Sequence, residues 1–315
     1  MRLLPLGLAV LLLGSPAGAG SRRCGDDVDG HGRTVPCACG DVLVGSRTLG
    51  PEDPITQQRC PGDGLLVQIA PGHPPATLQL GGATVEGSAH GVGIQVLDGG
   101  AEGLTISGPG TVSGFGTGVE ARRGLAAIRD VSATGNVADG FNLAGDGYAV
   151  RSCEATRNGR DGFALRGRGP RLDGNRAIAN GRHGFHVAGR EAELGAELAN
   201  EGLENSRDGM RVKGRGHVLT QPVARANGGS GIRARVSHGR IERARTDANA
   251  ADGLRAAGTA LTVTDSVANA NGGGGIAVQG AHVVDAGGNR AQGNRGLRHA
   301  RAVPQAECAV GTSCR

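Results

Sequence analysis

One four-residue pattern recurs along the chain: a glycine, an apolar residue, any residue and a second apolar residue. Apolar residues that alternate with other residues are typical of a short strand with one buried side, so each copy predicts one strand. The interval is 22 residues, except for two of 25 and a last one of 21. Full copies begin at Gly118, Gly140, Gly162, Gly184, Gly209, Gly231, Gly253 and Gly275, with degenerate copies at Gly93 and Gly296.

Other positions keep the same interval. An apolar residue stands twelve before the glycine, a small residue seven before it, and a second glycine five after it in most copies. Three apolar patches per unit predict three short strands and three bends, and we expect the recurrent glycines to supply positive-φ bends. An asparagine stands four residues before the glycine in seven consecutive copies, as Asn136, Asn158, Asn180, Asn205, Asn227, Asn249 and Asn271.

A single 22-residue unit cannot bury its inner side, whereas stacked units share a continuous core. The sequence therefore predicts an all-β solenoid of about ten rungs, each rung being one 22-residue turn. At the strand spacing of ~4.8 Å the asparagines would form a ladder of buried amides. Phe141, Phe163 and Phe185 share one position and should stack, and the two three-residue insertions should fall in loops. Leucine-rich and calcium-binding nonapeptide patterns are absent.

The ends of the chain differ from the repeat. Residues 1–19 have a short basic start, an apolar run and Ala17-Gly18-Ala19, which predicts a signal peptide cleaved after Ala19 and export to the periplasm or outside the cell. No other apolar run approaches the length of a membrane span. The formal charge of +5 becomes +4 without Arg2, too little to indicate a nucleic-acid partner. We divide the rest into a Cys-rich cap (20–63), the solenoid (64–300) and a tail (301–315).

Six of the seven cysteines lie in the cap and the tail, as Cys24, Cys37, Cys39, Cys60, Cys308 and Cys314. In an exported chain they predict disulfides that close both ends, with Cys153 left as a free core thiol. Cys37 and Cys39 are too close to pair with each other, which leaves two pairings for the cap. A metal site at Cys37-Ala38-Cys39 is the alternative, but the spacing is unusual for zinc, and we expect no metal or other cofactor.

With three strands per turn and an asparagine ladder, residues 64–300 resemble the right-handed parallel β-helix repeat proteins of the pectin-lyase-like superfamily. Cys39-Gly40-Asp41 and Cys60-Pro61-Gly62-Asp63-Gly64-Leu65 resemble the entry segment of its secreted bacterial members. The resemblance implies that Cys39 pairs with Cys60, and Cys24 with Cys37. The superfamily holds lyases, polygalacturonases, epimerases, adhesins and members without known activity, so the fold assigns no function.

Residues two and four after the glycine should point outward. They place Arg211, Arg233 and Arg255 in one column, with Lys213 and Arg235 beside it and Arg166 further along. Such a face could bind an acidic polysaccharide, because guanidinium groups match carboxylates. The alternative is an ordinary solvated face whose charges pair with the aspartates that stand one before the glycine, among them Asp161 and Asp208.

His183 interrupts this aspartate column between Asp161 and Asp208, with His186 and Arg211 alongside. A histidine between two carboxylates is expected to have a raised pKa and could act as acid or base, while Arg211 neutralises a uronate. The alternative is that all these residues occupy a turn, since Asp-Gly is typical of bends.

Motifs specific to pectin- and alginate-active families are missing, and Ser237-His238-Gly239 followed by Arg240-Ile241 matches polygalacturonase fragments only by chance. Tyr148 is the only ring expected at the surface. The sequence therefore favours an exported, non-catalytic surface or envelope module that binds acidic polysaccharide. The alternative is a polysaccharide lyase or epimerase acting through His183, His186 and Arg211.

Overall fold

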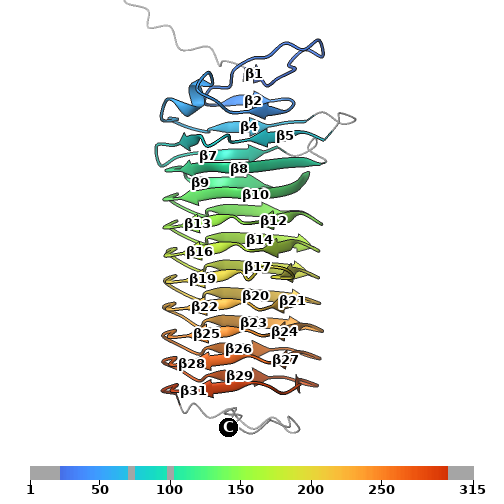
Figure 1. Ribbon diagram of the computed structural model, residues 1–315, viewed down its shortest axis with the longest axis vertical. Helices are drawn as coiled ribbons and strands as arrows, with labels where there is room; N and C mark the ends of the chain where they lie inside the picture. The colour runs from blue at the N-terminus through green and yellow to red at the C-terminus, as the bar shows by residue number, and fades with distance from the viewer. Residues whose placement is uncertain (1–21, 70–74, 98–102, 297–315) are drawn as a thin grey trace, which may run out of the picture.

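The computed structural model describes residues 22–69, 75–97 and 103–296, and these form a right-handed parallel β-helix with its rungs stacked along the long axis (Figure 1). It contains thirty-one strands and one short 3-10 helix, η1 (Pro54–Thr56). The predicted all-β solenoid is confirmed. The predicted signal peptide (1–19) and the C-terminal tail (301–315) lie outside the described residues.

One sheet runs the length of the molecule and contains twelve parallel strands. The expected count of about ten rungs is too low, because residues assigned to the N-terminal cap supply two further strands of this sheet, which pair with each other and of which the second pairs with the first strand of the solenoid. In order, the strands are β1 (Arg23–Cys24), β2 (Asp41–Leu43), β4 (Leu65–Val67), β7 (Val92–Val96), β9 (Thr117–Ala121), β11 (Phe141–Ala144), β14 (Phe163–Arg168), β17 (Phe185–Arg190), β20 (Met210–Arg215), β23 (Ile232–Ser237), β26 (Leu254–Ala257) and β29 (Ile276–Gln279).

The other two sides of the helix are also parallel ladders, joined where the long strands β8 (Leu104–Ser113) and β10 (Leu125–Thr134) run through both. The second ladder comprises β3 (Arg47–Thr48), β5 (Thr77–Gln79), β8, β10, β12 (Ala149–Arg151), β15 (Arg171–Asp173), β18 (Glu193–Leu194), β21 (Val218–Thr220), β24 (Arg240–Glu242), β27 (Thr262–Thr264) and β30 (Val284–Asp285). The third comprises β6 (Thr84–Glu86), β8, β10, β13 (Glu154–Thr156), β16 (Arg176–Ile178), β19 (Glu201–Leu203), β22 (Val223–Arg225), β25 (Arg245–Asp247), β28 (Val267–Asn269) and β31 (Arg290–Gln292).

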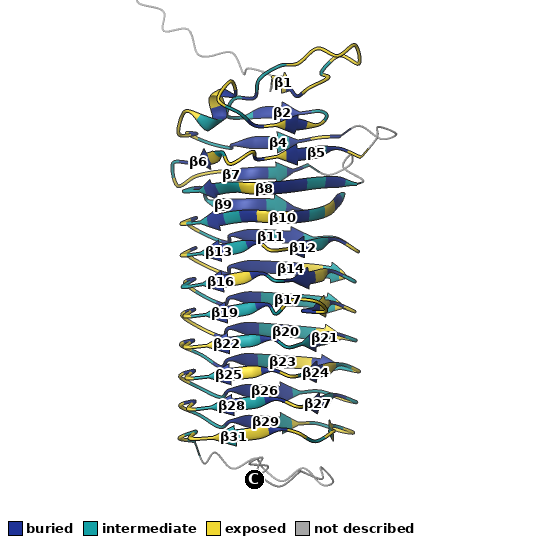
Figure 2. Ribbon diagram, in the orientation of Figure 1, coloured by how far each residue is buried: buried dark blue, intermediate teal, exposed yellow. Residues whose placement is uncertain are grey.

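The core is a column of small aliphatic side chains inside the three ladders, and buried and exposed positions alternate along the strands (Figure 2). The predicted phenylalanine stack is confirmed, because the rings of Phe141, Phe163 and Phe185 lie 4.8 Å apart and within 4° of parallel. The second insertion falls between β18 and β19, as expected. Tyr148 contradicts its predicted exposure: the ring is buried, and its hydroxyl lies 3.4 Å from the Leu143 and Arg166 carbonyl oxygens.

The asparagine ladder is confirmed and buried. At each step the side-chain oxygen accepts the backbone N–H and one side-chain N–H of the asparagine before it, at 2.9–3.0 Å. The structure adds an eighth member, Asn294, after Asn271. A second, shorter ladder joins Asn175 to Asn200 on another corner. Its column contains few asparagines, which is why the sequence did not reveal it.

The recurrent glycine at the start of each strand does not supply a positive-φ bend, so that expectation is wrong. A Cβ on Gly162 would lie 2.8 Å from the Asn180 side-chain nitrogen and 2.8 Å from the Gly184 carbonyl oxygen. The glycine is required because the asparagine of the next rung passes directly over it. Positive φ belongs instead to glycines five residues later, such as Gly167 at +135°.

The cap disulfides join Cys24 to Cys37 and Cys39 to Cys60, as the family resemblance implied. A metal site at Cys37-Ala38-Cys39 is thereby excluded, because both thiols are in disulfides. Cys153 is a free, buried thiol, as predicted. Cys308 and Cys314 lie outside the described residues. In the part of the chain that the structure describes, no helix is long and apolar enough to cross a membrane.

Candidate functional site

The predicted basic column lies on the outer face of the twelve-stranded sheet. Backbone pairing between β17, β20, β23 and β26 places His186, Arg211, Arg233 and Arg255 opposite one another in that order. Lys213 pairs with Arg235 in the adjacent column. The structure thus brings these residues together, one strand apart.

Arg166 is placed differently from the other predicted basic residues. It pairs with Ala188, which in turn pairs with Lys213, so one strand separates Arg166 from the nearest cation of its column. Arg166 therefore lies at the edge of the basic face.

Two further rows of arginine flank this face, and the sequence analysis missed both. The first lies in the turn before each strand, where backbone hydrogen bonds stack one rung on the next. The second lies at the far end of the same strands. Both keep the repeat interval, so the alignment that revealed the first column could have revealed them. The turn row is Arg160, Arg182 and Arg207, and the end row is Arg168, Arg190 and Arg215.

The aspartate column is a buried ladder rather than a set of exposed turn residues. Asp139 Oδ1 accepts the backbone N–H of Asp161 at 2.9 Å, and Asp161 Oδ1 accepts that of His183 at 3.0 Å. His183 Nδ1 accepts the N–H of Asp208 at 3.1 Å, and Asp208 Oδ1 accepts that of Ser230 at 3.0 Å. These side chains hold neighbouring rungs together, and each is at most 7% exposed.

Each outward cation or imidazole lies over the ladder residue of the preceding rung. His186 Nδ1 is 3.3 Å from Asp161 Oδ2, and Arg233 Nε is 3.6 Å from Asp208 Oδ2. Arg255 instead pairs within its own rung, with Asp252 at 3.6 Å. Arg211 lies over His183, with Arg211 Nη1 3.4 Å from Nε2. Among the described residues, Arg211 has no carboxylate oxygen within 4 Å.

The expected raised pKa of His183 is wrong. Burial, together with the nearby Arg211 and Arg182, lowers its pKa to about 4, against the opposite influence of Asp208 and Asp161. The two carboxylates do not prevail because the ring is only 1% exposed, so its charged form loses its water. His183 is therefore neutral at pH 7.

The pKa values of the carboxylates reflect their different partners. Burial alone would raise the pKa of Asp161, but the hydrogen bonds from His186 and from the His183 N–H, with Arg182 nearby, hold it below its usual value. Burial raises the pKa of Asp139, whose closest cation, Arg160, is 4.0 Å away. Asp161 is thus a stable anion beneath His186, which is the more exposed imidazole of the pair.

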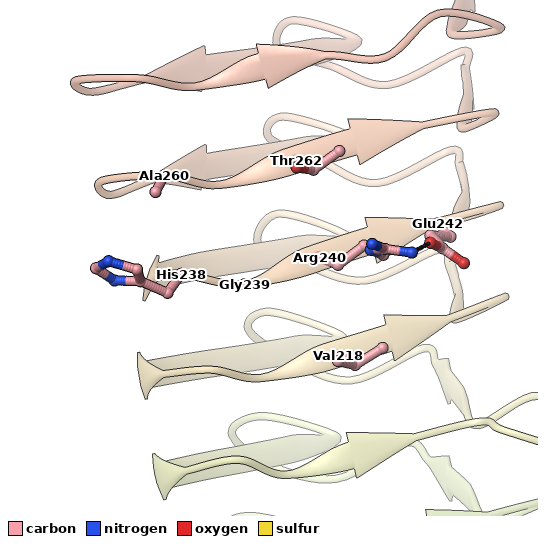
Figure 3. Close-up of a pocket in the computed structure, with 7 residues that line it drawn as sticks. All are labelled: Val218, His238, Gly239, Arg240, Glu242, Ala260 and Thr262. Carbon is pink, nitrogen blue, oxygen red and sulfur yellow. Dashed lines mark hydrogen bonds and ion pairs between the residues drawn. The ribbon is translucent and has the colours of Figure 1, made fainter.

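The basic face is not hollowed into a cleft. The space between Arg211, Lys213, Arg233 and Arg235 has no room for a water molecule. A larger open pocket of about 440 Å³ lies on the second ladder, at β21, β24 and β27 (Figure 3).

Two charged residues of the pocket pair with each other. The Arg240 side chain extends toward Glu242 and pairs with it at 2.9 Å, while His238 lies at the opposite end of the strand (Figure 3). His238, Gly239 and Arg240 of the Ser237–Ile241 segment therefore line the pocket, but its arginine is already paired. Within residues 22–69, 75–97 and 103–296, no group of three or more His, Cys, Asp or Glu side chains is arranged to hold a metal ion.

The A-module of a mannuronan C-5 epimerase from Azotobacter vinelandii superposes with a TM-score of 0.59 at 15% identity, covering 88% of this chain and 84% of that module. The chain shares the right-handed parallel β-helix fold of this module. A periplasmic alginate epimerase (TM-score 0.44, 12% identity, 78% of this chain and 72% of its own) and a pectate lyase (0.36, 15%, 80% and 71%) also match. At these identities the likeness concerns the fold alone. No family model and no curated protein matches the sequence.

Proposed function

We propose that this protein is a non-catalytic β-helix module that binds a linear acidic polysaccharide along the outer face of its twelve-stranded sheet. The observation that carries the proposal is the column Arg211, Arg233 and Arg255 in backbone register, with Lys213 and Arg235 beside it. A linear polyanion parallel to the helix axis would meet one cation per strand spacing of ~4.8 Å.

The flanking arginine rows support this proposal. Arg160, Arg182 and Arg207 widen the positive face at the start of the strands, and Arg190 and Arg215 widen it at the end. Buried aspartates pair with Arg160, Arg182 and Arg233. Among the described residues, Arg190, Arg207 and Arg215 have no carboxylate oxygen within 4 Å, so their guanidinium groups remain available. The solved epimerases and the lyase that share the fold are named for acidic polysaccharides, which agrees with the proposed ligand class.

A catalytic role through His183 is less well supported, because its Nδ1 already accepts a backbone N–H and its pKa is about 4. The face also lacks a cleft that could exclude water from a reaction. The alternative of a lyase or epimerase is supported by one arrangement. His186 lies 3.3 Å from Asp161 and opposite Arg211, so an accessible imidazole stands beside a cation.

The proposed location is outside the cytoplasm, in the periplasm or the extracellular space. The two cap disulfides are typical of proteins from an oxidising compartment, and they close the first rungs where unpaired strand edges would otherwise be exposed. The predicted signal peptide is the second argument for export.

The test is a titration of alginate, pectate and a neutral glucan at low and physiological salt. We expect both polyanions to bind, the neutral glucan not to bind, and affinity to fall steeply with salt, since exposed charges are screened within ~10 Å at 0.1 M. The variant Arg211→Ala/Arg233→Ala should lose binding.

The matched control is Arg171→Ala/Arg240→Ala, which removes two exposed arginines from the second ladder. Equal loss in both double variants, or equal binding of the neutral glucan, would contradict the proposal. New unsaturated ends on a bound polyanion would instead establish the lyase alternative, and His186→Ala would then be the first variant to examine.

A further inference from the structure

The ladder beneath the basic face departs from aspartate at two rungs, His183 and Ser230, and His183 is the one that lies beneath Arg211. Asp161 and Asp208 each present a carboxylate to the next rung, whereas His183 presents a neutral imidazole between them. This difference decides whether the arginine of the following rung has a carboxylate beneath it. Arg233 has Asp208 beneath it at 3.6 Å, but Arg211 has His183. The replacement of a carboxylate by an imidazole thus removes the counter-ion of Arg211.

The tautomer of His183 is set by the backbone N–H group that points at its ring. The N–H of Asp208 points at Nδ1 from 3.1 Å, so Nδ1 must carry the lone pair. A neutral imidazole has one N–H, which is then on Nε2. Nε2 faces Arg211 Nη1 at 3.4 Å, and a guanidinium nitrogen is also a donor only. Two donors therefore face each other without an acceptor.

A third donor in the same place is also unsatisfied. Arg211 Nε is buried and has no hydrogen-bond partner. Arg182 Nε and Arg233 Nε share this lack of a hydrogen bond, but each has an aspartate oxygen within 3.6 Å. Arg211 alone among these three has no carboxylate nearby. Buried polar groups in native proteins nearly always have partners, so such a set indicates a missing acceptor.

We propose that this rung is a single-carboxylate subsite, in which Arg211 and the Nε2–H of His183 together bind one carboxylate of the acidic polysaccharide. A guanidinium matches the planar fork of a carboxylate, and the imidazole N–H supplies a further donor beside it. The subsite rests on the proposed function and deepens it: the other rungs attract the polymer by charge, and this rung sets which sugar carboxylate is held. His183 acts there as a fixed donor.

The experiment uses sodium glucuronate as a one-carboxylate probe, with glucose as its neutral analogue, in NMR titrations of the full-length mature protein. The central variant is His183→Asp, which restores the residue type of the column. Its carboxylate can accept the Asp208 N–H and pair with Arg211, so the fold should be kept while the subsite is filled. We expect glucuronate to bind the wild type and to bind His183→Asp at least tenfold more weakly, with the Arg211 Nε–H signal shifting only in the wild type.

His238→Asp is the matched control, because it makes the same residue change in the turn between β23 and β24, and it should leave glucuronate affinity unchanged. Arg211→Gln changes a partly exposed residue and serves as a second test, with the same expected loss. Unchanged affinity in both His183→Asp and Arg211→Gln would overturn the subsite, as would equal binding of glucose.

The two proposals fail separately. If alginate still binds with a steep salt dependence while glucuronate ignores His183→Asp, the subsite is wrong and the basic face stands. If alginate binding also survives Arg211→Ala/Arg233→Ala, the proposed function is wrong. The converse variant, Asp208→His, should remove the counter-ion of Arg233 and raise the number of glucuronate sites from one to two. A stoichiometry that stays at one would contradict the pairing rule on which the subsite depends.

Discussion

Replacing Asn180 by leucine tests the asparagine ladder, on which the stacking of the rungs depends. Asn180 makes four side-chain hydrogen bonds. Its oxygen accepts the backbone N–H and a side-chain N–H of Asn158, and its nitrogen donates to Ala155 and Asn205. In the leucine variant the two Asn158 donors and the Ala155 carbonyl lose a partner, whereas the Asn205 oxygen keeps the Asn180 backbone N–H.

Two buried N–H groups of Asn158 are thus left without an acceptor, and the Ala155 carbonyl loses one donor. At ~1–3 kcal/mol for each unsatisfied group, the expected loss is about 2 kcal/mol or more in the free energy of unfolding. Asn142→Leu is the matched control, because it makes the same change at an outward position whose amide has one surface contact, to Glu120. We expect that control to cost less than ~1 kcal/mol, as surface changes usually do. Arg233→Ala, at a weak and partly exposed ion pair, should also stay below ~1 kcal/mol.

Urea denaturation followed by circular dichroism measures the stability of each variant. The midpoints of two variants are compared only where the slopes of their transitions are equal, because long repeat proteins can unfold in parts. A loss in Asn180→Leu no larger than that in Asn142→Leu would refute the reasoning. It would mean that the amide ladder adds little to the free energy of unfolding.

Two other outcomes follow from buried titratable groups. Burial lowers the pKa of both His183 and His217 below the ordinary 6.5, so their contribution to stability is complete above pH 6.5 and is lost as the pH falls below it, for His183 toward its pKa of about 4. For His183 alone this loss is about 3 kcal/mol in the free energy of unfolding. His183→Asn keeps an acceptor for the Asp208 N–H but does not titrate, so it should reduce the acid sensitivity measured in denaturation series at pH 7, 5 and 4. An unchanged pH profile would contradict the burial argument. Burial also raises the pKa of Cys153 to about 12, so a thiol reagent should leave it unmodified in the folded protein. The unfolded, unreduced protein should then give one thiol, and a count of three or more would show that one end of the chain is not closed by disulfides.

Much of the fold could be predicted from the sequence, because the repeat makes each position visible many times. The asparagine column and the phenylalanine stack follow the repeat, and the second insertion lengthens one interval to 25 residues within a loop. The cap strands were missed because they precede the repeat and share none of its pattern. The glycine at the strand start was misinterpreted, since a close approach by the next rung is a relation between two segments and leaves no local signal.

The candidate site could be predicted only in part. Period-two alternation correctly placed Arg211, Arg233 and Arg255 on one outer column. The same alternation could not show that the side chain before each glycine is buried, so the ladder that these aspartates form was not predicted. Burial then reversed the expected pKa shift of His183, because desolvation outweighed its two carboxylate partners. A column reveals which residues are neighbours, but the pKa depends on how much water reaches them.

The most direct test of the central claim is a crystal structure of the mature protein with an acidic oligosaccharide of four or more uronate residues. The account predicts density along the outer face of β17, β20, β23 and β26, parallel to the helix axis, with one carboxylate between Arg211 and His183 Nε2. Ligand density in the pocket lined by His238, Arg240 and Glu242 with none on the basic face would contradict it.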